Sequence, residues 1–195
     1  MALLGLFLAG TLECFFWRQE GRRNWRLVLL LVPALIGLGV RFTLPWGPHI
    51  GSGRDLRYLD EVILGPAQAH TRLLGSFYFW LQWIGDPLAG YRWGQIVLGA
   101  LGCGLAALLT YRLLRDGLGA LTAGLLAALL MALARVDASP DVMPLQRLVL
   151  FGTLILAVSY MDSRRASTLA AVVAGLLAFS YGRLENPLFA LLVFV

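Results

Sequence analysis

The stretch Leu27–Trp46, LVLLLVPALIGLGVRFTLPW, decides the class of this protein. It carries a single charged residue, Arg41. A transmembrane helix needs about 20 consecutive, mostly apolar residues. We therefore predict a membrane span here, with the long side chain of Arg41 extending toward the far end of the span.

Other apolar stretches have similar composition. Met1–Trp17 is apolar except for Glu13 and predicts a first or partial span. Further spans are predicted at Trp93–Leu114, Leu118–Ala134, Val142–Met161 and from Thr168 onwards. Leu73–Ile84 is too short to cross and rich in aromatic residues, which favours a helix lying at the headgroup level. The expected fold is an all-α, polytopic transmembrane helical bundle of five to six spans, with an outer loop that carries a short interfacial helix.

The composition excludes a soluble globular protein. The chain has 195 residues, of which 59% are hydrophobic and 14% charged, whereas soluble domains are about 25% charged. Its net charge of +5 comes from arginines that lie between apolar stretches, where positive charge sets membrane topology. We therefore expect no binding to nucleic acid. Cys14 and Cys103 both lie in apolar stretches and form no disulfide framework or metal motif.

We expect residues 1–195 to form one transmembrane domain, incomplete at its carboxyl terminus. Residues 1–26 would form an N-terminal helix and a basic inner loop, and residues 47–90 an outer loop with the interfacial helix. The arginines of three short segments would face the cytoplasm by the positive-inside rule. They are Arg18, Arg22, Arg23 and Arg26, then Arg112 and Arg115, then Arg164 and Arg165. The predicted location is the inner (cytoplasmic) membrane of a bacterium, with several passes.

Most carboxylates fall on the opposite, outer side. They are Asp55, Asp60, Glu61, Asp86, Asp137, Asp141 and Glu185. Charges near a membrane are costly and tend to be functional, so three outer segments that carry acids indicate a site. The alternative is that loops in water simply carry charge.

Asp60 and Glu61 are adjacent, so their side chains would point about 100° apart on a helix. One of them could then act as a general base or hold a divalent cation through oxygen. Arg72, with Arg54 and Arg57, could bind a phosphate through its planar guanidinium. The alternative is an ordinary ion pair of Asp60 with Arg57 or Arg54.

The remaining polar candidates lie in the same outer segments. His70 has no second histidine at metal-ligand spacing, which makes a zinc site improbable; a hydrogen-bonding role is the simpler interpretation. Arg135 could be the counter-ion of Asp137 and Asp141, although Asp141 also fits as the cap of the helix that follows.

A third cluster, Arg183 and Glu185 before Pro187, interrupts an apolar stretch. Irregular backbone at membrane depth is tolerated where it lines protein or water, so this break predicts the edge of a cavity. It equally fits a plain loop between two spans. Elsewhere, small residues four apart permit close helix packing: Ala100 and Gly104, Ala120 and Gly124, Ala171 and Gly175.

This order of motifs resembles a known family. An outer loop with Asp60-Glu61 is followed by His70 before an aromatic stretch, then by Ile84–Arg92, Tyr111–Arg115, Arg135–Asp141 and Gly182–Pro187. The layout is similar to the amino-terminal portion of GT-C type glycosyltransferases, within the protein O-mannosyltransferase and aminoarabinose transferase superfamily. Two features depart from the family: Thr71-Arg72 stands where prolines are usual, and family members are much longer.

The resemblance implies that the chain takes a sugar from a polyprenyl-phosphate donor at the outer face of the membrane. It implies that Asp60 is the catalytic acid of the loop with Glu61 beside it, and that His70 matches the histidine before the short helix. Asp137 or Asp141 would be a second acidic site residue, and Arg183 the basic residue that opens the later helix.

A second hypothesis is a non-catalytic, GT-C-like accessory subunit of a larger membrane complex, bioenergetic or photosynthetic, because fold does not guarantee function. Its partners would be membrane lipids and other membrane subunits. A transporter is a weaker third option, since a helix break near Pro187 is typical of broken transporter helices but no second repeat is visible.

Overall fold

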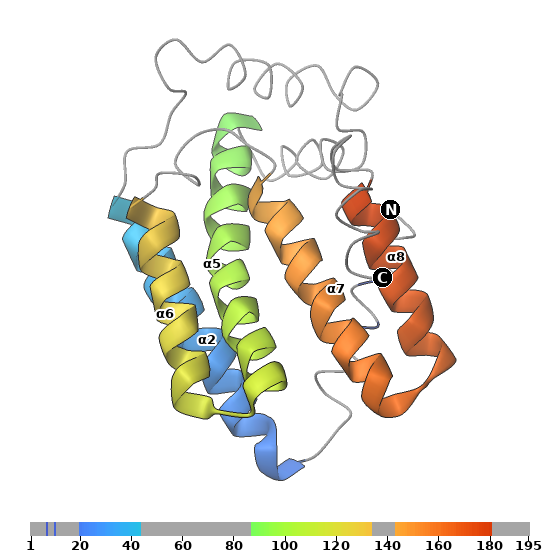
Figure 1. The fold of residues 1–195 in the computed structure, drawn as a ribbon. Helices are drawn as coiled ribbons and strands as arrows, with labels where there is room; N and C mark the ends of the chain where they lie inside the picture. The colour runs from blue at the N-terminus through green and yellow to red at the C-terminus, as the bar shows by residue number, and fades with distance from the viewer. Residues whose placement is uncertain (1–6, 8–9, 11–19, 44–86, 134–142, 181–195) are drawn as a thin grey trace.

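A computed structural model describes residues 7 and 10 and the ranges 20–43, 87–133 and 143–180 (Figure 1). Within these residues the chain forms five α-helices and no β-strand. The helices are α2 (Glu20–Thr43), α5 (Pro87–Leu114), α6 (Gly117–Leu133), α7 (Met143–Ser163) and α8 (Ala166–Ser180). The predicted all-α class is therefore confirmed for this part of the chain.

Three of these helices are long and apolar enough to cross a membrane, as expected of an integral membrane protein. The qualifying segments are Trp25–Thr43 in α2, Arg92–Leu114 in α5 and Pro144–Ser163 in α7. Gly117–Leu130 in α6 and Ala166–Ser180 in α8 are shorter apolar helices. The full number of five to six spans stays a prediction.

Two helices begin earlier than the sequence predicted. Residues 20–26, expected in a basic inner loop, are the first turns of α2. Residues 87–90, expected in the outer loop, belong to α5, which begins at Pro87. Proline suits the first position of a helix because its fixed φ is helical and it needs no amide donor there. Apolar length locates a span, but the helix itself continues into polar residues beyond it.

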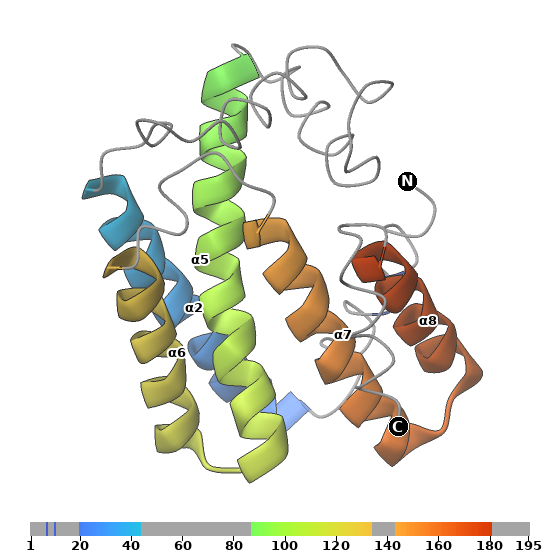
Figure 2. The ribbon, with the colours of Figure 1, turned by 45° about the horizontal axis from the view of Figure 1, so that its top comes forward.

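Helix α5 lies at the centre of the described bundle. It packs against α2, α6 and α7, while α2 also packs against α6, and α7 against α8 (Figures 1 and 2). One group therefore consists of α2, α5 and α6, and the other consists of α7 and α8. The contact between α5 and α7 joins the two groups.

Small residues allow the close approaches that the sequence predicted. A Cβ added at Gly104 of α5 would collide with the backbone oxygen of Leu30 in α2. One added at Gly124 of α6 would lie 2.7 Å from the Cβ of Ala107 in α5. One added at Gly175 of α8 would collide with the hydroxyl of Thr153 in α7. Side chains essentially never come this close, so each glycine is required for its helix pair to pack.

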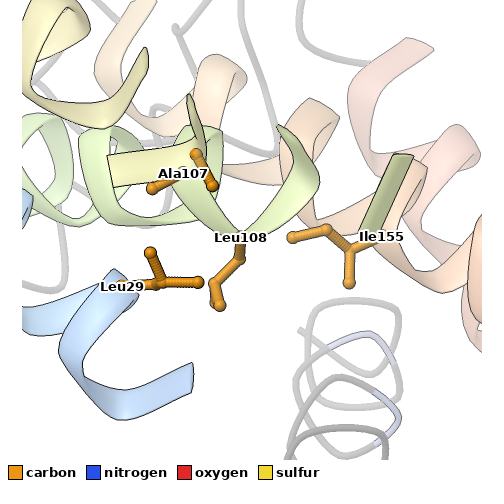
Figure 3. Close-up of a cluster of buried hydrophobic side chains, with 5 residues drawn as sticks. Leu29, Ala107, Leu108 and Ile155 are labelled. Atoms are coloured by element: carbon orange, nitrogen blue, oxygen red, sulfur yellow. The ribbon is translucent and has the colours of Figure 1, made fainter. Parts of the chain in front are cut away.

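Two apolar clusters fill the bundle. In the first, Leu29 of α2, Leu108 of α5 and Ile155 of α7 converge, together with Ala107 and Ala120 (Figure 3). In the second, Phe7 packs with Leu156 of α7 and with Ala171 and Val172 of α8. Phe7 and Gly10 are the described residues of Met1–Trp17, and the buried Phe7 packs against α7 and α8.

Two short turns connect antiparallel helices, and they share one geometry. Arg115 follows α5 with φ 56°, and Arg164 follows α7 with φ 52°. The amide of each donates to the carbonyl four residues earlier, that of Tyr111 at 2.8 Å and that of Tyr160 at 2.7 Å. This is the left-handed helix ending in which glycine is usually found. Both turns lie at the end of the bundle where α2 begins (Figure 1), which we call the lower end.

Candidate functional site

The residues predicted to form the site all lie outside the described part of the chain. They are Asp60, Glu61, His70, Arg72, Arg135, Asp137, Asp141, Arg183 and Glu185. Their roles in catalysis and in substrate binding stay predictions. The structure does describe the helix ends to which their segments are joined.

These helix ends lie together at one end of the bundle. Helix α2 ends at Thr43 and α5 begins at Pro87, α6 ends at Leu133 and α7 begins at Met143, and α8 ends at Ser180. All five lie at the end opposite the two arginine turns (Figures 1 and 2); we call this the upper end. The segments that carry the predicted site residues are therefore joined to the bundle at a common end.

Of the ten arginines among the described residues, Arg41, Arg92 and Arg147 lie toward the upper end and the other seven lie at the opposite end. Residues 22, 23 and 26 lie in the first turns of α2, and Arg112, Arg115, Arg164 and Arg165 lie at or beside the two turns. All seven belong to the lower end. Most of the described arginines therefore lie at the end opposite the one to which the predicted acidic segments are joined.

A charged side chain is buried between α2 and α5. Arg41 is 3% exposed, and its guanidinium donates to the carbonyl of Gly37 at 3.0 Å and to Sγ of Cys103 at 3.7 Å. The thiol of Cys103 in turn donates to the carbonyl of Gly99 at 3.3 Å. Cys103 lies midway along Arg92–Leu114, so the guanidinium sits near the middle of a predicted span.

The expectation that Arg41 extends toward the far end of its span is therefore wrong. In an α-helix each Cα–Cβ bond points toward the amino terminus. Arg41 lies in the last turn of α2, so its side chain turns back along the helix to Gly37 instead of outward. Gly37 makes room for it, because a Cβ there would lie 2.9 Å from a guanidinium nitrogen of Arg41.

Two buried glutamines lie nearer the upper end. Gln95 of α5 is fully buried, and Gln146, in the first turn of α7, is 4% exposed. The side-chain nitrogen of Gln146 has no hydrogen-bond partner among the residues that the structure describes. Gln146 follows the predicted site residue Asp141 by five positions. Sequence reasoning missed both glutamines because a neutral polar residue inside an apolar stretch resembles ordinary variation.

The described helices offer no metal site. Among residues 20–43, 87–133 and 143–180, no group of three histidine, cysteine or carboxylate side chains could hold an ion. The carboxylates considered for a divalent cation, Asp60 and Glu61, lie outside these ranges. A metal requirement therefore stays a question about the outer segments.

Comparison with known proteins adds no assignment: no protein family, no curated protein and no solved structure matches this chain.

Proposed function

We propose that this protein is a membrane glycosyltransferase of the GT-C type, which takes a sugar from a polyprenyl-phosphate donor at the outer face of a bacterial inner membrane. The observation that carries the proposal is the common end shared by the helix ends beside the three acidic segments. A transferase of this kind needs carboxylates from distant parts of the chain near one membrane surface, and this topology meets that need.

In the proposed reaction, Asp60 acts as general base on the acceptor hydroxyl, with Glu61 beside it. The acceptor oxygen then bonds to the anomeric carbon of the sugar, and the bond from that carbon to the donor phosphate breaks. The polyprenyl phosphate leaves with its negative charge, which arginines such as Arg72 and Arg135 stabilise. His70, Asp137, Asp141, Arg183 and Glu185 complete the substrate-binding set.

The seven lower-end arginines support the orientation that this reaction requires. By the positive-inside rule they face the cytoplasm, which puts the upper end, and the acidic segments joined to it, on the outer side. A lipid-linked sugar donor would reach this end from the outer leaflet.

The test is sugar transfer in membranes that contain the full-length protein. Polyprenyl-phosphate mannose and polyprenyl-phosphate aminoarabinose serve as donors, and release of polyprenyl phosphate is measured. We expect Asp60→Asn to lower turnover by about 10²-fold or more, the usual size of a general-base contribution.

Asp116→Asn is the matched control, because it makes the same carboxylate-to-amide change at the lower end. Asp116 accepts hydrogen bonds from the amides of Leu118 and Gly119 at the start of α6, and asparagine caps a helix about as well. Undiminished turnover in Asp60→Asn would refute the assignment. Absence of transfer by the wild-type protein, with other membrane chains co-purifying, would favour the accessory-subunit alternative.

A further inference from the structure

A pair of aromatic rings joins α2 and α5 at the surface of the bundle. The rings of Phe42 in α2 and Trp93 in α5 have centroids 5.0 Å apart and planes inclined by 67°. Phe42 is 44% exposed and Trp93 is 51% exposed, so the pair does not belong to the core. Phe42 lies at the end of the candidate span Trp25–Thr43, and Trp93 at the start of Arg92–Leu114. The pair therefore lies at the upper boundary of both spans, where aromatic side chains meet lipid headgroups.

Below the aromatic pair, apolar side chains of both helices stay exposed. Val97 follows Trp93 by four residues and Leu35 precedes Phe42 by seven, so each lies on the same helix face as its aromatic residue. Val97 and Leu35 are both exposed. Because α5 leads down from the upper end and α2 leads up to it, both positions lie closer to the middle of the membrane than the aromatic pair. We call the surface formed by Leu35, Gly39, Phe42, Trp93 and Val97 the α2–α5 face.

Gly39 leaves this face without side-chain cover between Leu35 and Phe42. It is exposed, and a Cβ added there would meet nothing within 4 Å. Gly37, two residues earlier, is different, because a Cβ there would crowd the guanidinium of Arg41. Helix packing therefore explains the glycine at position 37 but not the one at position 39. Glycine inside a helix lowers its stability and is used where another molecule approaches the backbone closely.

A cationic side chain lies at the upper edge of the α2–α5 face. Arg92 directly precedes Trp93, is exposed, and makes no hydrogen bond or ion pair with the residues that the structure describes. Side chains of a helix point toward its amino terminus, so that of Arg92 is directed toward the upper end. A guanidinium just above exposed hydrocarbon complements a lipid whose phosphate lies at the membrane surface.

The same two helices carry the segment that holds the proposed catalytic residue. Residues 44–86 join Thr43 of α2 to Pro87 of α5, and they include Asp60. The upper edge of the α2–α5 face is therefore next to both points at which this segment joins the bundle. A donor lipid on this face would hold its phosphate at the height of these two points, as sugar transfer at Asp60 requires.

We propose that the α2–α5 face binds the polyprenyl phosphate of the sugar donor, an inference that rests on the proposed function. The guanidinium of Arg92 donates hydrogen bonds to the phosphate oxygens. The first isoprene units lie against the rings of Phe42 and Trp93, and the chain continues over Gly39 toward Leu35. The methyl branches of an isoprenoid chain need more width than an unbranched acyl chain, and the missing side chain at Gly39 supplies it.

The experiment measures binding of the lipid instead of sugar transfer. The full chain in a mild detergent is titrated in native mass spectrometry with undecaprenyl phosphate, undecaprenol and phosphatidylglycerol in parallel. We expect one undecaprenyl phosphate to bind about tenfold more tightly than undecaprenol, because only the phosphate accepts charge-assisted hydrogen bonds. It should also bind about tenfold more tightly than phosphatidylglycerol, which lacks the branched chain. Equal binding of undecaprenyl phosphate and phosphatidylglycerol would overturn the proposal, since the face would then accept any anionic lipid.

Two substitutions at exposed positions locate the bound lipid. Arg92→Gln should weaken binding of undecaprenyl phosphate about tenfold by removing the charged donor, and Gly39→Leu about as much by covering the gap. The matched controls are Arg115→Gln at the lower end and Ala170→Leu on α8, both also at exposed positions. The controls should bind the lipid as the wild type does. Unchanged binding by Arg92→Gln and Gly39→Leu would exclude this face.

Asp60→Asn separates this proposal from the proposed function. It should bind undecaprenyl phosphate as tightly as the wild type, because Asp60 acts on the acceptor, while its turnover falls. Undiminished turnover in Asp60→Asn, with lipid binding that Gly39→Leu weakens, would refute the catalytic assignment and support the lipid site. Loss of turnover in Asp60→Asn, with lipid binding that neither Arg92→Gln nor Gly39→Leu changes, would refute the lipid site alone.

Discussion

Arginine occupies two contrasting environments in this bundle. Arg115 and Arg164 are exposed in the turns of the lower end, whereas Arg41 is buried between α2 and α5 and bonded to Gly37 and Cys103. Side chains of a helix point toward its amino terminus. An arginine in the last turn is therefore directed back along the helix, and one placed beyond the last turn is not. For these three arginines, the position relative to the last turn of the helix matches whether the side chain is buried or exposed.

The largest expected effect on stability comes from a substitution that pushes α2 and α5 apart. These two helices enclose Arg41. Gly104→Ala places a Cβ against the backbone oxygen of Leu30. We expect a loss of about 3 kcal/mol in the free energy of unfolding, the upper range for overpacking. Unfolding in mixed detergent micelles measures it.

Gly102→Ala is the matched control in the same helix, because a Cβ there would meet nothing within 4 Å. It should be neutral or stabilise by up to about 1 kcal/mol, since alanine favours helix. Equal stability of the two variants would show that α2 and α5 do not pack as closely as described.

Removal of the buried charge should have the next largest effect. Arg41→Ala loses hydrogen bonds from a charged donor and leaves a cavity, which should cost about 2 kcal/mol. It should also make Cys103 reactive to a membrane-permeant maleimide, measured in a Cys14→Ala background. Labelling of Cys103 at the same rate in both proteins would contradict the contact between Arg41 and Cys103.

A smaller effect is expected at the lower end, where Asp116 caps α6. Asp116→Ala should cost about 1 kcal/mol and Asp116→Asn almost nothing, because asparagine replaces the lost acceptor. Thermal unfolding in detergent compares the two variants. A similar loss in both would mean that the charge of Asp116, rather than its capping bonds, is what matters.

The smallest expected effect on stability concerns the two turn residues that have positive φ. Arg115→Gly and Arg164→Gly should each stabilise the protein by up to about 1 kcal/mol, because glycine adopts positive φ without a Cβ clash. The same thermal measurement applies. Destabilisation by both would show that the arginine side chains hold the turns together.

The sequence allowed much of the helical framework to be predicted, because apolar length and small-residue spacing are local patterns. Gly104, Gly124 and Gly175 indeed lie at close helix contacts. The inward direction of Arg41 was missed because it depends on the direction of α2 and on the space beside Gly37. Gln95 and Gln146 were missed because burial of a neutral amide depends on how helices meet. The predicted site residues, of which Asp60 is the first and Glu185 the last, all lie outside the described ranges. Their arrangement therefore stays a prediction.

The central claim is that the acidic segments and the arginine turns lie on opposite sides of a membrane. The test uses three single-cysteine variants in a cysteine-free background: Asp60→Cys, Asp137→Cys and Asp116→Cys. Intact cells that carry each variant are treated with a membrane-impermeant maleimide, and labelling of the cysteine is measured. We expect positions 60 and 137 to be labelled from outside, and position 116 only after the membrane is permeabilised. Labelling of positions 60 and 116 from the same side would contradict the claim.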